Sequence, residues 1–126
     1  MLILDSGGFS KLSARTRAAV ALIEELKRAD LWPALVPTVV LVEALQGHPG
    51  KDALANRFLK TVLKEPEVSV GTARRAAELR RRSGRGSAVD ALVVALAEPN
   101  GTVLTGDEAD ITALAVYARS VSVELV

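Results

Sequence analysis

The stretch Leu2-Ile3-Leu4-Asp5, directly after the first methionine, decides the fold. Three consecutive apolar residues are typical of a short strand that is buried on both faces of a parallel sheet. Asp5 follows at the carboxyl end of that strand, where an ionised carboxylate is costly to bury without a partner. The sequence therefore predicts a buried first strand that ends in a candidate functional side chain.

Helical and extended patterns alternate along the rest of the chain. Gly7-Gly8 is expected to break the first strand, and prolines and glycines separate the later segments. Because such alternation is typical of a parallel sheet covered on both faces, we predict an α/β fold with three α/β/α layers and a central, mainly parallel sheet, as one domain over residues 1–126. Strands are expected at 2–4, 35–36, 68–70, 102–104 and 121–126, and helices around 20–28, at 38–45 with Thr38 as N-cap, 52–63, 72–82, 87–97 and 107–118.

The composition supports a globular domain and excludes several kinds of site. Hydrophobic residues make up 49% of the 126 residues and the net charge is +1, so the chain is neither a disordered tail nor a polybasic binder. The absence of cysteine excludes disulfides, thiolate catalysis and cysteine-based zinc sites. Without a signal peptide or a run long enough to span a bilayer, a cytoplasmic location with no membrane partner is expected.

Four carboxylates stand in unusual surroundings. Asp5 and Asp107 each follow a predicted strand, and ligands of parallel sheets bind at the edge where the carboxyl ends of the strands lie. Glu43 stands among valines and leucines, and Asp90 is the only charged residue within 87–97. Acids in apolar surroundings usually have a partner, which makes these four candidates for a shared site.

Each of these acids also has a local explanation. Asp5 can cap a turn by accepting from the amides of the glycines that follow it. Ser87-x-x-Asp90 has the pattern of a capping box, and Asp107 can be an N-cap with a second acid three residues on. Glu43 requires either a buried partner or an edge exposed to water.

Convergence of the four acids would favour a metal site. Neighbouring carboxylates repel and raise one another's pKa, and a hard divalent cation relieves that repulsion. Oxygen ligands, without cysteine and with a single histidine, favour Mg²⁺ or Mn²⁺ over zinc. Such a cluster suits the hydrolysis of phosphodiesters by a metal-activated water.

Four stretches carry a family resemblance that covers nearly the whole chain: Leu2–Ser6, Pro37–Leu45, Ala88–Ala97 and Val103–Ile111. At these residues the chain resembles the PIN domain family, specifically the VapC-type toxins of bacterial type II toxin–antitoxin systems. The resemblance implies a PIN-like fold. It assigns to the family's acidic quartet, as catalytic residues and metal ligands, Asp5, Glu43, Asp90 and Asp107.

The resemblance also assigns supporting positions. Thr105 matches a hydroxyl residue that helps to organise the site, Ser6 stands where the family commonly has Thr or Ser, and Asp110 is a candidate for a fifth acid. The chain departs from the family at Gly7-Gly8, where a bulkier run is common. These glycines either let a substrate approach the backbone or mark a tight turn.

The implied function is that of an endoribonuclease dependent on Mg²⁺ or Mn²⁺. The resemblance further implies a homodimer and inhibition by a cognate antitoxin protein. The basic helix around Arg75 is expected to present a solvated face, whereas the loop 83–86 leads directly into the helix of Asp90. Side chains at this loop and beyond the first strand are therefore candidates for binding RNA phosphates: Arg82, Arg85, Lys11 and Arg15.

The main alternative is a catalytically inactive PIN-like module that binds RNA or a protein, against which the intact quartet argues. A haloacid-dehalogenase-like phosphatase requires a second acid two residues after Asp5, where Gly7 stands. A response-regulator receiver requires an early acidic pair and a phosphoacceptor aspartate, and neither is evident. Nucleotide chemistry of the P-loop type is excluded because the chain lacks the Gly-x-x-x-x-Gly-Lys-Ser/Thr pattern.

Overall fold

The computed structural model describes residues 1–126 and contains one five-stranded sheet in which all neighbouring strands are parallel. The strand order is β3-β2-β1-β4-β5, so the first strand of the chain lies at the centre. The predicted α/β fold with a central parallel sheet is confirmed. The strands are β1 (Leu2–Leu4), β2 (Leu35–Pro37), β3 (Leu63–Glu65), β4 (Thr102–Thr105) and β5 (Ser122–Leu125).

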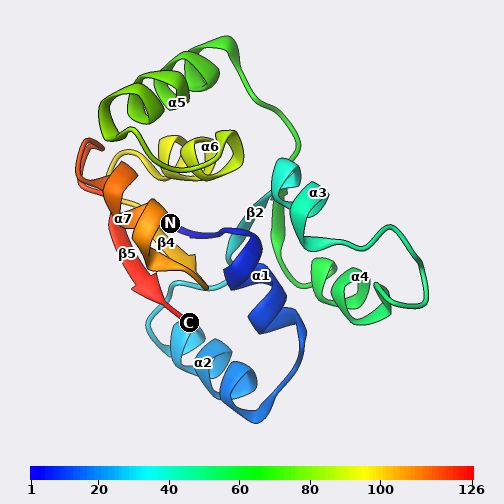
Figure 1. Ribbon diagram of the computed structural model, residues 1–126. Coiled ribbons are helices and arrows are strands. Elements are labelled where there is room, and N and C mark those ends of the chain that lie inside the picture. The colour runs from blue at the N-terminus through cyan, green and yellow to red at the C-terminus, as the bar shows by residue number, and fades with distance from the viewer.

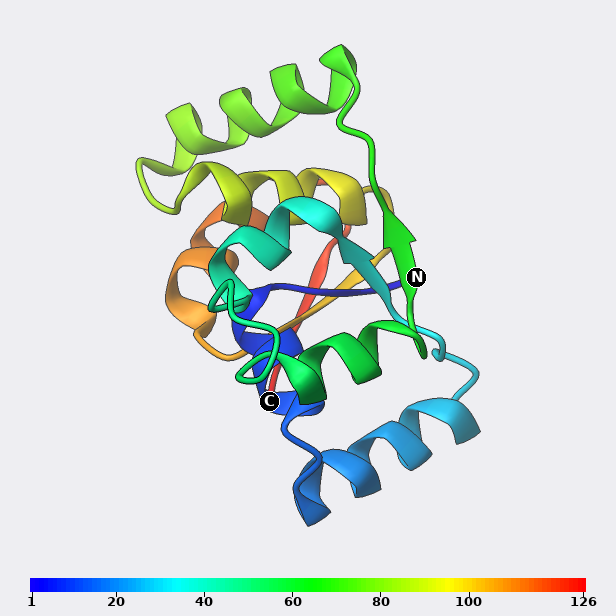
Figure 2. The same ribbon diagram turned by 90° about the vertical axis from the view of Figure 1, so that its right-hand side faces the viewer.

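Helices cover both faces of this sheet, which confirms the three predicted layers (Figure 1). Figure 2 shows α5 and α6 together on one side and α1, α2 and α4 on the other. α7 packs against α5 and α6. The arrangement follows from right-handed parallel crossovers, because the chain moves outward from β1 to β3 and then returns to build β4 and β5 on the other side of β1. The helices are α1 (Ser6–Ser13), α2 (Arg17–Arg28), α3 (Leu41–Ala44), α4 (Ala53–Leu59), α5 (Val70–Ser83), α6 (Ala88–Ala97) and α7 (Glu108–Ala115).

None of these helices combines the length and the apolar character that crossing a membrane requires.

The pairing of β1 with β4 joins segments that are about a hundred residues apart in the sequence. Leu4 pairs with Leu104, so Asp5 lies beside Thr105 at the carboxyl edge of the sheet. The backbone N–H of Asp5 donates to the carbonyl oxygen of Leu104 at 3.2 Å. Because β1 is the central strand, its three residues are almost completely buried, as the apolar run predicted.

The third strand is not where the sequence placed it. Leu63–Glu65 forms β3 beside β2, whereas the strand expected at 68–70 is absent and α5 begins at Val70. The side chain of Ser69 accepts a hydrogen bond from the backbone N–H of Thr72 at 3.0 Å and caps that helix. The helix expected over 52–63 accordingly ends at Leu59, which frees residues 63–65 for the sheet.

The segment that carries Glu43 also differs in detail from the prediction. A short 3₁₀ helix, Thr38–Val40, precedes α3, and no side chain caps either element. The expected N-cap at Thr38 is wrong, because its hydroxyl instead donates to the carbonyl oxygen of Glu65 at 3.3 Å. This bond ties the end of β2 to the end of β3.

Gly7 and Gly8 are not what ends the first strand, since β1 stops at Leu4 and both glycines lie in the first turn of α1. A β-carbon at position 8 would lie 2.2 Å from the carbonyl oxygen of Leu104, and one at position 7 would lie 2.9 Å from the Cα of Gly106. These glycines therefore allow α1 to pack directly on the end of β4. The strand ends here as expected, but the glycines form neither the break nor a tight turn, because helical geometry begins immediately after Asp5.

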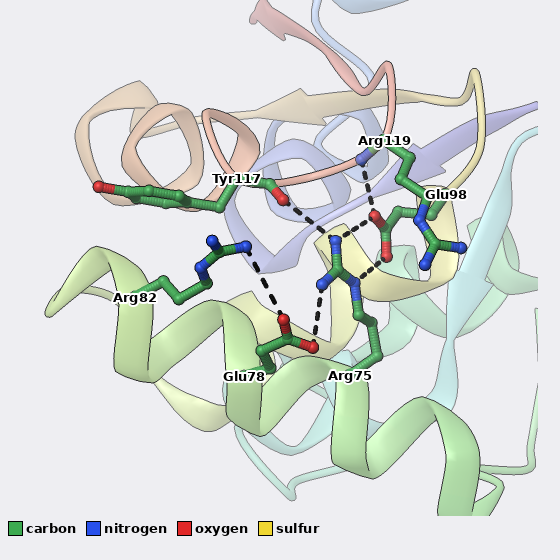
Figure 3. A network of polar contacts seen from close by, with 6 residues as sticks. All are labelled: Arg75, Glu78, Arg82, Glu98, Tyr117 and Arg119. Carbon is green, nitrogen blue, oxygen red and sulfur yellow. Dashed lines mark hydrogen bonds and ion pairs between the residues drawn. The ribbon is translucent and has the colours of Figure 1, made fainter.

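A polar network ties α5 to the far end of α6 (Figure 3). Arg75 donates to both carboxylate oxygens of Glu98, at 2.7 and 2.9 Å, and to the carbonyl oxygen of Tyr117 at 3.0 Å. The guanidinium of Arg75 holds the pKa of Glu98 below its usual range. The solvated role expected for Arg75 is thus wrong, because its partners come from segments that are distant in the sequence.

We expect Gly8→Ala to destabilise the protein. The added β-carbon would overlap backbone atoms of β4, and overpacking of this kind costs about 1–3 kcal/mol or more. Gly71→Ala is the matched control, because a β-carbon at position 71 in the first turn of α5 would meet only the hydroxyl of Ser69, at an ordinary contact distance of 3.8 Å, and alanine there should be neutral or stabilise by up to about 1 kcal/mol. Urea unfolding measures both, and equal stabilities for the two variants would contradict the close packing of α1 on β4.

Candidate functional site

A polar pocket lies where the carboxyl ends of β1 and β4 meet the N-termini of α1, α6 and α7. Its volume is about 530 Å³, and no hydrophobic side chain lines it. The structure brings all four acids of the predicted quartet to this pocket. The lining also includes Asp110, the hydroxyl-bearing Ser6, Ser10 and Ser87, and one cationic side chain, Lys11.

Asp5 is the most enclosed of the acids, with 6% of its surface exposed. One of its oxygens accepts a hydrogen bond from the backbone N–H of Gly8 at 2.7 Å, which makes Asp5 the N-cap of α1. The other accepts from the hydroxyl of Thr105. The local capping role considered for Asp5 is therefore confirmed, and the same carboxylate lines the pocket.

Thr105 connects the two acids that follow β1 and β4. Its side chain is fully buried, and its hydroxyl accepts a hydrogen bond from the backbone N–H of Asp107 at 3.0 Å. The carbonyl oxygen of Asp107 lies 2.8 Å from the same hydroxyl. Because this hydroxyl also donates to Asp5, one side chain positions both segments.

Asp90 and Asp107 are held by helix caps that leave part of each carboxylate free. Asp90 and Ser87 form a capping box with two reciprocal bonds of 3.0 Å at the start of α6. Asp107 caps α7 by accepting from the backbone N–H of Ala109 at 3.2 Å. Each carboxylate uses one oxygen in its cap, so the other is available to a ligand.

Glu43 and Asp110 differ from the other three acids. Glu43 lies on α3 with its side chain exposed and without a hydrogen bond, which settles the alternative in favour of a water-exposed edge. Asp110 makes no capping bond; its carboxylate instead accepts from Nε of Arg85 at 3.1 Å.

Burial raises the pKa of Asp5 above its ordinary value of 3.8. The hydrogen bonds from Thr105 and Gly8 oppose this shift, and the negative charge of Asp90 adds to it. The ionised form of Asp5 is thus disfavoured, and either a proton or a positively charged neighbour would stabilise this carboxyl group.

The donor set of the pocket fits a hard divalent cation. Carboxylate and hydroxyl oxygens are the ligands that Mg²⁺ and Mn²⁺ prefer, and the pocket contains no sulfur or imidazole ligand. The acids do not form a ready-made coordination shell, because no group of three acidic or histidine side chains lies close enough together to hold a metal ion. A cation would have to draw the free oxygens of Asp90 and Asp107 and the unbonded Glu43 toward Asp5.

The four predicted RNA-binding cations separate into two pairs. Lys11 lines the pocket and donates to the carbonyl oxygen of Val126 at 2.8 Å, and Arg85 lies at the rim through its bond to Asp110. Arg15 lines a different pocket, between α1, α2 and α4. Arg82 faces the ring of Tyr117, 5.5 Å from its centroid (Figure 3).

Sequence reasoning did not single out two residues of the pocket. Ser10 follows Ser6 by four residues on α1, so helical periodicity could have identified it. Gly106 is different, because its place depends on the close approach of Gly7, whose Cα would lie 3.1 Å from a β-carbon at position 106. Only tertiary packing reveals that contact.

The fold and site together define a class: a three-layer α/β/α protein with an acidic pocket at the carboxyl edge of its parallel sheet. A solved structure with the same fold is that of FitAcB from Neisseria gonorrhoeae, with a TM-score of 0.60, 20% sequence identity and coverage of 98% of this chain and 96% of that chain. The likeness confirms the predicted fold class. No protein-family model matches the sequence, and no curated protein does either.

We expect Asp5→Asn to preserve the fold. The side-chain oxygen of the introduced asparagine can accept from the backbone N–H of Gly8, and its side-chain nitrogen can donate to the hydroxyl of Thr105. The hydroxyl proton of Thr105 is then donated to the carbonyl oxygen of Asp107. Because the native pKa of Asp5 is raised, this group lowers the free energy of unfolding as the pH rises above 3.8. In chelator, the unfolding temperature of Asp5→Asn relative to wild type should therefore increase between pH 4 and pH 7; a decrease would contradict the shift.

Thr105→Val should be strongly destabilising for its size. It removes the hydroxyl that bonds Asp5 and the backbone of Asp107, and an unpaired buried polar group costs about 1–3 kcal/mol. Thr105→Ser keeps the hydroxyl and is the control, with a smaller loss from the missing methyl group. Chemical denaturation distinguishes them, and equal losses for valine and serine would show that the hydroxyl has no role.

Proposed function

We propose that this protein is an endoribonuclease dependent on Mg²⁺ or Mn²⁺ and acts as the toxin of a toxin–antitoxin pair. The observation that carries the proposal is the convergence of Asp5, Glu43, Asp90 and Asp107 on one pocket that lacks apolar side chains. These acids come from four separate segments of the chain. The sequence resemblance to VapC-type toxins and the fold shared with FitAcB support the same conclusion.

The chain's own residues prepare the pocket for phosphodiester hydrolysis. Asp5 is held by Gly8 and Thr105, and the caps of α6 and α7 fix one oxygen each of Asp90 and Asp107, so only the free oxygens of those two acids have to turn toward Asp5 when a cation binds. A bound divalent cation would supply a water of lowered pKa and positive charge beside the scissile phosphate. Lys11, the one cation in the lining, is placed to contact a phosphate oxygen.

The proposal includes RNA as the substrate, a cognate antitoxin protein as inhibitor and a homodimer as the assembly. The resemblance to VapC-type toxins supports all three. In this setting, the exposed Glu43 is the adjustable ligand, because no hydrogen bond holds its carboxylate in place. The rival function is an inactive PIN-like module that binds RNA or a protein.

Asp5→Asn and Asp90→Asn should each abolish RNA cleavage in the presence of Mg²⁺ or Mn²⁺. Loss of a residue that only supports a metal ligand typically costs 10- to 100-fold, so loss of a ligand itself should lower the cleavage rate by at least about a hundredfold. Gel assays on single-stranded RNA with purified variants measure this. EDTA should stop the wild-type reaction, and added Mn²⁺ should restore it.

Glu25→Gln is the matched control, since Glu25 is an exposed acid on α2 that does not line the pocket. Its cleavage rate should equal that of the wild type. Wild-type rates from Asp5→Asn, or cleavage that persists in EDTA, would overturn the proposed activity. Absence of metal-dependent cleavage by the wild type on every RNA tested would favour the binding module.

A further inference from the structure

We propose that Arg85 forms a binding site for a substrate phosphate next to the reaction pocket, and that Asp110 orients Arg85 instead of binding the metal. The inference rests on the proposed function, because it names the neighbouring phosphate of the same nucleic-acid substrate. It is carried by the ion pair between Nε of Arg85 and Oδ1 of Asp110, at 3.1 Å, on the rim of the acidic pocket.

The loop between α5 and α6 is built to place Arg85 at this rim. Gly84 and Gly86 both have left-handed backbone angles, with φ of 65° and 86°. The hydroxyl of Ser83 accepts from the backbone N–H of Arg85 at 3.2 Å and donates to its carbonyl oxygen at 3.1 Å. A β-carbon at position 86 would lie 2.6 Å from a methyl group of Leu114, and the left-handed φ of 86° favours glycine, so glycine lets the loop pack on α7 without strain or displacement of that side chain.

The ion pair leaves most of the guanidinium available. Asp110 contacts only Nε, and neither terminal nitrogen of Arg85 has a hydrogen-bond partner within the protein. The side chains are 57% and 41% exposed, so the pair is reachable from solvent and contributes little to stability. A guanidinium held at one nitrogen with two free donors suits a phosphate group, which it can bind in a bidentate manner.

The negative charge of the pocket creates a need for a cationic group such as Arg85 at its rim. Five carboxylates repel a polyanion, and Lys11 is the only cation in the lining. A nucleic acid that reaches the pocket requires cationic groups at the rim, where they contact phosphates beside the one that reacts. Arg85 meets this requirement from a different element than Lys11, which lies on α1.

Asp110 differs from the quartet in how its charge is used. Asp90 and Asp107 each spend one oxygen on a backbone cap and keep the other free, whereas the charge of Asp110 is already offset by Arg85. A carboxylate paired with a guanidinium is a weaker ligand for a cation, because the metal must compete with the arginine. We therefore assign Asp110 as a positioning residue for Arg85.

The test measures binding of a single-stranded oligoribonucleotide by fluorescence anisotropy over a range of NaCl concentrations. All variants carry Asp5→Asn, so that the RNA is not cleaved. Arg85→Gln should weaken binding about tenfold and reduce the salt slope by about 0.7, the value for one lost phosphate contact on a single strand. Arg28→Gln is the matched control, because Arg28 is an exposed arginine on α2 that does not line the pocket, and it should leave both quantities unchanged.

Asp110→Asn tests whether Asp110 orients Arg85 or acts only as a negative charge that repels RNA. With Arg85 present, it should weaken RNA binding by about three- to fivefold, the scale of an exposed ion pair. In the Arg85→Gln background it should leave binding unchanged or strengthen it, because only a repelling charge is then removed. Equal strengthening in both backgrounds, or an Arg85→Gln variant that behaves like Arg28→Gln, would overturn the proposal.

Metal binding provides the independent readout. In calorimetric titrations with Mn²⁺, every protein keeps the native Asp5. The dissociation constant of Asp110→Asn should stay within about twofold of the wild-type value, and Asp90→Asn should bind Mn²⁺ at least about tenfold more weakly. Comparable losses in both variants would make Asp110 a ligand and overturn its assignment. If the wild type binds RNA through Arg85 but cleaves none, the proposed enzymatic function fails while the phosphate site stands.

Discussion

The parallel register between β1 and β4 is the constraint on which the rest of the structure depends. Pairing of Leu4 with Leu104 places Asp5 beside Thr105, and the hydroxyl of Thr105 then bonds both Asp5 and the backbone of Asp107. α1 can begin directly after Asp5 only because Gly8 lets the helix lie against the carbonyl of Leu104. A change of one residue in this register would turn the acids away from a common pocket, because neighbouring strand residues face opposite sides of the sheet.

The acids combine two roles that the sequence presented as alternatives. Asp5, Asp90 and Asp107 each cap a helix, and each also lines the pocket. Three helix N-termini converge there, and their partial positive charges favour nearby carboxylates. Capping also limits side-chain motion, so the local bonds keep the carboxylates at the pocket although they do not bring them close enough together to coordinate a cation. Burial nevertheless raises the pKa of Asp5, and a positive charge in the pocket would oppose that shift.

Much of the fold was predictable because its cause is local. The apolar run of β1, the capping box of α6 and the strand β4 each follow from neighbouring residues, and the structure confirms them. The errors involve partners that are distant in the sequence. Leu63–Glu65 becomes a strand by pairing with β2, and Arg75 turns from solvent to Glu98 and Tyr117. The residues around Leu63–Glu65 and around Arg75 contain no local pattern that predicts this strand or these partners.

The sequence by itself determined the alternation of strands and helices, the position of an acid after the first and fourth strands, and the absence of cysteine chemistry. These features depend on periodicity, capping and composition, which act over a few residues. Only the tertiary structure decided that the acids share one pocket, that Gly7 and Gly8 serve the packing of α1, and that Arg85 pairs with Asp110 across 25 positions of the chain. Those outcomes depend on strand order and close approach between segments, which residue patterns along the chain do not specify.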